Sequence, residues 1–138
     1  MLGLTKKQFL KRSKTCLDET GNHALLIREL IGHERDESIP YEEAYKQIKL
    51  VIEGVEAIFF RYEALDPPSK CVSLHLKLLH SLITLQDATA ANYDFITASL
   101  KDDTVEAAKK LEETQLILEK FRTEFRPITT EVDVLLSK

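Results

Sequence analysis

Residues that break helices or cross-link chains are scarce in this sequence. Its 138 residues include only four glycines, four prolines and two cysteines, and no tryptophan. Two cysteines are too few for a disulfide framework, and the separation of Cys16 from Cys71 does not match a metal-ligand motif. Because so few glycines and prolines are available for turns, the chain favours a small number of long elements, and its many Leu, Ala, Glu and Lys residues favour helices.

Long apolar runs are also missing. The longest uninterrupted apolar stretches are a few residues, far short of the roughly 20 that span a bilayer, so the sequence predicts no membrane span. After Phe9 and Leu10 the chain meets Lys11 and Arg12, where a secretory signal would need its apolar region. The expected location is therefore the cytoplasm.

Charge of one sign dominates only locally. The net charge is −4, yet residues 1–17 hold five basic residues and no acidic one. A basic arm of this kind can touch phosphate or an acidic partner, but on a short helix it is more typical of a solvated face. The acidic remainder argues against extended nucleic-acid contact, because backbone affinity grows with the number of phosphates neutralised.

Three polar or proline-containing breaks divide the chain into four segments. They are GHERDES at 32–38, DPPS at 66–69 and KDDT at 101–104. The expected helices cover about 5–31, 40–65, 67–100 and 104–126. Segments of similar length joined by short loops predict an all-α fold, an antiparallel up-down four-helix bundle forming a single domain over 1–138.

Local signals refine the ends of these helices. Thr5 can cap the first, and Asp103 with Glu106 forms a capping-box pattern for the last. Asp66 followed by Pro67 is expected to start the third helix, as Pro40 helps to start the second. The first helix is expected to bend near Gly21. Pro127 is expected to break the fourth, and a short C-terminal helix is expected to follow within 127–138.

The third segment has more apolar surface than one core stripe requires. At about 100° per residue, Leu74, Leu78, Leu82 and Leu85 share one direction. A second stripe lies about 100° away and contains Val72, Leu76, Leu79, Ile83 and Ala90. Either the C-terminal segment covers this stripe through Val132, Leu135 and Leu136, or it is exposed and marks a partner surface.

Polar residues border the second stripe. Thr84, Asp87 and Asp94 fall within about 40° of His80 around the same helix. Asp87 and Asp94 would supply a charged border that orients a docked helix. The sequence thus predicts a non-enzymatic protein that acts by protein–protein interaction or as a homodimer. The expected binding residues are Val72, Leu76, Leu79, Ile83, Asp87 and Asp94.

Two alternatives remain at this stage. One is a bundle that binds a small ligand or a metal, although His75 and His80 are about 140° apart on the helix and diverge. The other is an enzyme that uses Cys71 and His75 as a nucleophilic couple. Phosphate-binding glycine loops and the G-x-S-x-G, C-x-x-C and H-E-x-x-H motifs are absent from the sequence. No catalytic residue, metal ligand or cofactor is assigned.

Overall fold

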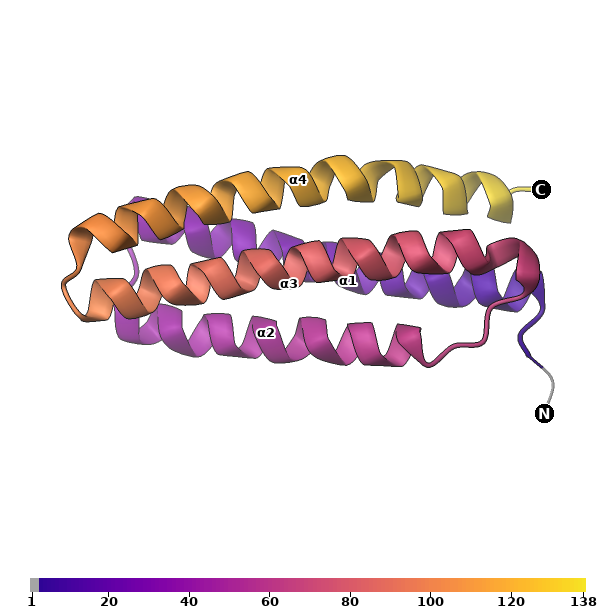
Figure 1. Ribbon diagram of the computed structural model, residues 1–138, viewed down its shortest axis with the longest axis horizontal. Helices are drawn as coiled ribbons and strands as arrows, with labels where there is room; N and C mark the ends of the chain where they lie inside the picture. The colour runs from indigo at the N-terminus through magenta and orange to yellow at the C-terminus, as the bar shows by residue number, and fades with distance from the viewer. Residues whose placement is uncertain (1–2) are drawn as a thin grey trace.

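The computed structural model describes residues 3–138 and shows an all-α, antiparallel four-helix bundle (Figure 1). The helices are α1 (Lys6–Arg35), α2 (Tyr41–Glu63), α3 (Val72–Leu100) and α4 (Thr104–Leu136), with a short 3-10 helix, η1 (Ser69–Cys71), before α3. Each helix packs against the next along the chain, and α4 closes the ring against α1. The predicted fold class is therefore confirmed.

Two of the predicted caps form. The Thr5 hydroxyl accepts a hydrogen bond from the Gln8 backbone N–H at 3.1 Å, and the Gln8 side chain accepts one from the Thr5 N–H at 2.9 Å. At α4, the Asp103 carboxylate accepts from the Glu106 N–H at 3.1 Å. Each cap satisfies backbone donors that the first turn of a helix leaves without a partner.

The start of the third helix was predicted wrongly. Asp66 does not cap it; α3 begins at Val72, after η1. Pro68 has φ −63° and ψ 156°, an extended conformation, and a proline also disfavours the helical conformation in the residue before it. Two consecutive prolines thus hold residues 67–68 outside the helix, and helical hydrogen bonding starts only beyond them.

The first helix is longer than predicted and continues through Gly21. It ends at Arg35 rather than near residue 31, so the polar sequence GHER is its last turn. Leu30, Ile31 and Glu34 are all buried in that region. Their burial favours continuing the helix past Gly32, whose intrinsic cost in a helix is only about 1 kcal/mol.

The last helix is also longer than predicted, because α4 does not stop at Pro127. It continues to Leu136, and no separate C-terminal helix forms. Ile128 and Val132 are buried, and Leu135 and Leu136 pack against the core. Pro127 itself is exposed, so its ring faces solvent and its main cost is one missing N–H to the backbone of the preceding turn. Helix α4 arches along the bundle in Figure 1.

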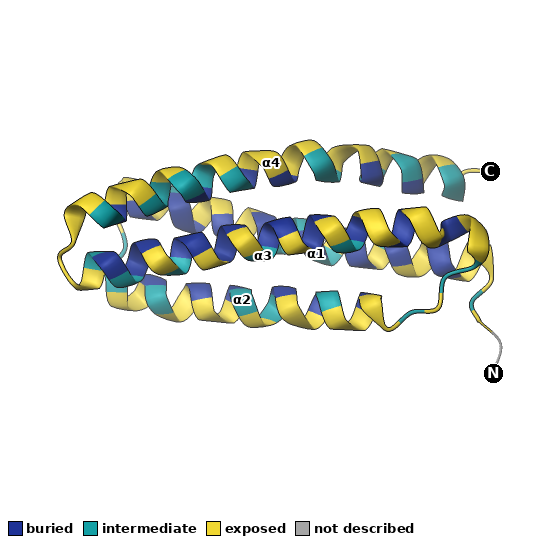
Figure 2. Cartoon of the chain, viewed as in Figure 1, coloured by how far each residue is buried: buried dark blue, intermediate teal, exposed yellow. Residues whose placement is uncertain are grey.

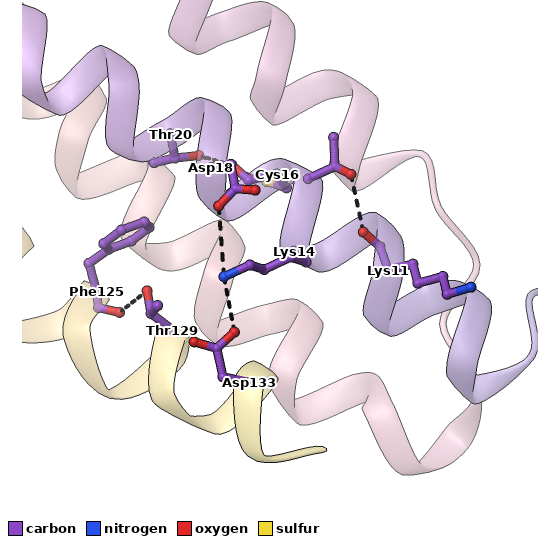
Figure 3. A network of polar contacts seen from close by, with 9 residues as sticks. Lys11, Lys14, Cys16, Asp18, Thr20, Phe125, Thr129 and Asp133 are labelled. Carbon is purple, nitrogen blue, oxygen red and sulfur yellow. Dashed lines mark hydrogen bonds and ion pairs between the residues drawn. The ribbon is translucent and has the colours of Figure 1, made fainter. Parts of the chain in front are cut away.

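An ion-pair network fastens this C-terminal part of α4 to α1. The Lys14 ammonium lies 3.0 Å from the Asp133 carboxylate of α4 and 3.8 Å from that of Asp18 on α1 (Figure 3). The hydrogen bond to Asp133 raises the pKa of Lys14. One residue of the basic arm therefore takes part in the bundle itself.

Candidate functional site

Helix α3 keeps an exposed apolar surface after the bundle has formed. Leu76 is 60% exposed, and Val72 and Ile83 are each 43% exposed. Leu79 is half-buried and packs against the core. Figure 2 shows exposed segments recurring along the N-terminal half of α3, between α2 and α4. Val132, Leu135 and Leu136 of α4 pack into or against the core, and Val72, Leu76 and Ile83 nevertheless remain exposed.

Helix α2 extends this surface. The hydroxyl oxygens of Tyr45 and Tyr93 lie 3.4 Å apart, which fixes the register of the antiparallel α2 and α3. Two heptads further along α2 and two back along α3, Phe59 lies level with Leu79. The next residue, Phe60, is 61% exposed, and its ring meets that of Phe59 edge to face at 5.7 Å.

We call this surface the α2/α3 apolar face. It consists of Phe60, Val72, Leu76, Leu79 and Ile83. Helical periodicity in the sequence predicted the four α3 residues of this face, but it did not predict Phe60. The α2 pattern assigns Phe59 to the core stripe, and only the register between the two helices shows that its exposed neighbour Phe60 lies level with the α3 stripe.

Asp87 and Asp94 are both exposed on the side of α3 that turns toward α4. Asp94 approaches the Lys110 ammonium of α4 at 3.9 Å, whereas Asp87 makes no ion pair with any residue in 3–138. The structure thus places both carboxylates beside the α2/α3 apolar face. They follow Ile83 along the chain, toward the C-terminal end of α3.

His80 and Thr84 belong to a different surface. The Thr84 hydroxyl donates to one carboxylate oxygen of Glu124 on α4 at 2.7 Å, and His80 Nε2 lies 3.4 Å from the other. Thr84 is buried, although the sequence pattern placed it in a polar stripe with His80, whose side chain is exposed. These two residues form a polar seam between α3 and α4.

A hollow of about 310 Å³ adjoins this seam. Its lining residues are Lys77, His80, Ser81, Glu124, Pro127, Ile128 and Glu131. Lys77 and Glu131 close one side with an ion pair at 3.2 Å. Among residues 3–138 no group of three or more His, Cys, Asp or Glu side chains is placed to hold a metal ion, so His80 and Glu124 remain a pair.

Cys71 and His75 do not form a couple in the structure. His75 Nε2 bonds to the Tyr62 backbone carbonyl oxygen at 2.8 Å, and its ring packs against the rings of Phe9 and Tyr62. Both Cys71 and His75 are buried. His75 Nε2 thus joins α3 to the end of α2, which is a structural role, and among the described residues no hydrogen bond links His75 to the Cys71 thiol.

A buried carboxyl group lies at the other end of the bundle. Glu34 Oε1 accepts a hydrogen bond from Asn92 Nδ2 at 2.8 Å, and both residues are buried. Glu34 Oε2 and Asn92 Oδ1 have no partner among the described residues. Burial raises the pKa of Glu34 from 4.5 to about 7, while the Asn92 hydrogen bond lowers it in part. A proton on Oε2 supplies a donor where the pair otherwise has only acceptors left.

Comparison with protein-family models, with curated proteins and with solved structures finds no match for this chain. Among the helices that the structure describes, none combines the length and apolar character that crossing a bilayer would require. Functional inference therefore rests on the surfaces of the bundle.

Proposed function

We propose that this protein acts by binding another protein chain through the α2/α3 apolar face. The observation that carries the proposal is the grouping of large exposed apolar side chains, Phe60, Val72, Leu76 and Ile83, on two adjacent helices. Single exposed apolar residues are ordinary, but a contiguous group marks an interaction surface. The bundle already has a continuous core, so these side chains are available to a partner.

The energetic scale fits reversible association. Complete burial of a Val, Leu, Ile or Phe side chain contributes about 1.5–3 kcal/mol. About half of that is gained already on folding, because these side chains are partly covered in the bundle. Each would then add about 1 kcal/mol in a complex, before the loss of translational freedom is subtracted.

The proposal includes the cytoplasmic location that the sequence predicts. Cys16 and Cys71 are both buried free thiols in the described part of the chain. Free thiols persist in a reducing compartment, and the cytoplasm is such a compartment. We therefore propose a cytoplasmic binding protein.

A photo-crosslinking amino acid at position 76 tests the interaction. The matched control is position 116, because Leu116 of α4 is 66% exposed and lies outside the α2/α3 apolar face. In cells that express the protein, irradiation is expected to give a protein adduct from position 76 and none of the same kind from position 116. Equal labelling at the two positions, or none at either, would show that this face is not a docking surface.

A further inference from the structure

We propose that the partner is a second copy of this chain, bound with the two α3 helices antiparallel and side by side. This inference rests on the proposed function, since it names the occupant of the α2/α3 apolar face. The two-fold axis would cross α3 at the level of Ser81. Self-complementarity of apolar residues and of charges along α3 supports this arrangement.

The apolar residues fit one antiparallel register. With the axis level with Ser81, Leu79 lies opposite the partner's Ile83, and Val72 lies opposite the partner's Ala90. Leu76 then meets the partner's Gln86, whose methylene groups can cover it. Each contact occurs twice by symmetry. The exposed Ala90 is small and allows the helices to approach closely where Val72 is inserted.

Charges on the α4 side of this face are separated by sign along the helix. Lys77, which also pairs with Glu131 of α4, lies toward its N-terminal end, and Asp87, which has no ion pair within residues 3–138, lies toward its C-terminal end. Antiparallel pairing brings Lys77 level with the partner's Asp87. This pair is centred on residue 82, about 1.5 Å from the axis that the apolar residues select. A parallel arrangement would instead bring identical charges together.

Helix α2 repeats the pattern on the opposite side of the face. From the Tyr45–Tyr93 contact, Lys49 lies level with residue 89 of α3, and Glu63 lies level with residue 75. Both side chains are exposed. The two-fold axis therefore brings Lys49 level with the partner's Glu63, and this pair is again centred on residue 82. Two charge pairs and the apolar register thus select nearly the same axis.

One charge opposes the association. Glu56 is exposed on α2 and lies level with residue 82, so it faces the partner's Glu56 near the axis. Like charges at close range destabilise a complex. Replacing this residue with glutamine is therefore expected to tighten the dimer, an effect opposite in sign to that of most surface changes in an interface.

Disulfide trapping tests the register. Val72→Cys and Ala90→Cys chains are prepared separately, and both positions are exposed. When the two chains are mixed and oxidised, we expect a disulfide-linked dimer that joins position 72 to position 90. Each variant alone should not cross-link, because two copies of position 72 would lie about 27 Å apart along the helices. Buried Cys16 and Cys71 are common to both variants and serve as the internal control.

Sedimentation equilibrium tests the charges. Asp87→Lys should raise the dimer Kd about three- to tenfold, because each lost pair occurs twice. Adding Lys77→Asp to Asp87→Lys should recover most of the affinity. Glu56→Gln should lower the Kd, and Leu116→Glu should leave it unchanged. Circular dichroism of each variant reports whether the bundle is retained.

The outcomes separate this inference from the proposed function. Cross-linking of Val72→Cys chains with one another would establish a parallel dimer and overturn the antiparallel register. A wild-type chain that is monomeric at about 1 mM would overturn self-association. In that case, an adduct at position 76 that contains a different protein would still support the proposed function. The lack of any adduct would contradict both the proposed function and the dimer.

Discussion

Glu34 combines burial with an incomplete set of hydrogen-bond partners. It is held by Asn92 through one hydrogen bond, and one buried oxygen on each residue is left unpaired among the described residues. If Glu34 were ionised, Glu34 Oε2 and Asn92 Oδ1 would both stay without a donor in the bundle interior, which is costly. The protonated form is therefore the one that this part of the bundle accommodates.

The stability of the protein should consequently depend on pH through Glu34. Its pKa is raised from 4.5 to about 7 in the folded chain. Between these values the folded chain holds a proton that the unfolded chain has released, so the free energy of unfolding falls as pH rises through this window. Glu34→Gln keeps a donor and an acceptor for Asn92 and does not titrate. At pH 8 this variant should be more stable than wild type by up to about 3 kcal/mol, and near pH 4.5 the two should be similar.

Urea unfolding followed by circular dichroism at several pH values between 4.5 and 8 measures this difference. Glu29→Gln is the control, because it removes an exposed carboxylate from the same helix. Its stability curve should run parallel to that of the wild type. If the Glu34→Gln curve is parallel as well, Glu34 does not carry a proton in the folded chain.

At the scale of single helices, the sequence was sufficient for the four long helices and for two of their starts, but not for η1 or for the continuity of α4. Capping depends on residues a few positions apart, and Thr5 and Asp103 therefore act as their local patterns predict. The ends of α1 and α4 depend on burial of residues beyond Gly32 and Pro127. Reading these two residues as breakers gave the wrong ends, because packing against other helices outweighs a local cost of a few kcal/mol.

In the candidate site, too, the sequence predicts what depends on one helix and fails for what depends on packing between helices. Rotation along one helix was enough to group Val72, Leu76, Leu79 and Ile83, since that grouping needs no knowledge of other helices. It could not show that Leu79 is half-buried or that the exposed Phe60 lies level with the stripe. Both facts depend on how α2 and α3 are aligned, which the Tyr45–Tyr93 contact reveals only in the folded chain.

Two glycines in helices should respond in opposite ways to the same substitution. A Cβ added at Gly32 of α1 would meet no heavy atom within 4 Å, whereas one at Gly54 of α2 would clash with the imidazole ring of His23 at Nε2. Gly32→Ala should stabilise the protein by about 0.5–1 kcal/mol, since alanine favours the helix. Gly54→Ala should give none of that gain, because the His23 ring, which bonds to the Glu19 carbonyl oxygen at 2.9 Å, must move.

Thermal unfolding of the two variants beside the wild type checks this contrast, with each serving as the control for the other. A Gly54→Ala protein as stable as the Gly32→Ala protein would mean that His23 can leave its position beside α2 without loss.

At the scale of the whole molecule, α3 lies between α2 and α4 and contributes to both the core and the proposed docking surface (Figure 1). Leu78, Leu82 and Leu85 are fully buried, while Leu76 and Ile83 on the same helix face outward. A helix with apolar residues over so much of its circumference requires cover on more than one side. The bundle provides that cover for the core stripe, and association would provide it for the other.

If a second copy supplies the cover, association must stabilise the folded chain by mass action. A dimer that forms only between folded chains makes the melting temperature depend on protein concentration. For a chain of this length, each tenfold increase in concentration above the dimer Kd should raise the melting temperature by about 2 °C. Scanning calorimetry of the wild type over two decades of concentration measures the slope of melting temperature against concentration.

Leu76→Glu should abolish the slope and Leu116→Glu should preserve it, since both remove an exposed leucine but only Leu76 lies in the α2/α3 apolar face. Equal slopes in these two variants would mean that the copies associate through another surface.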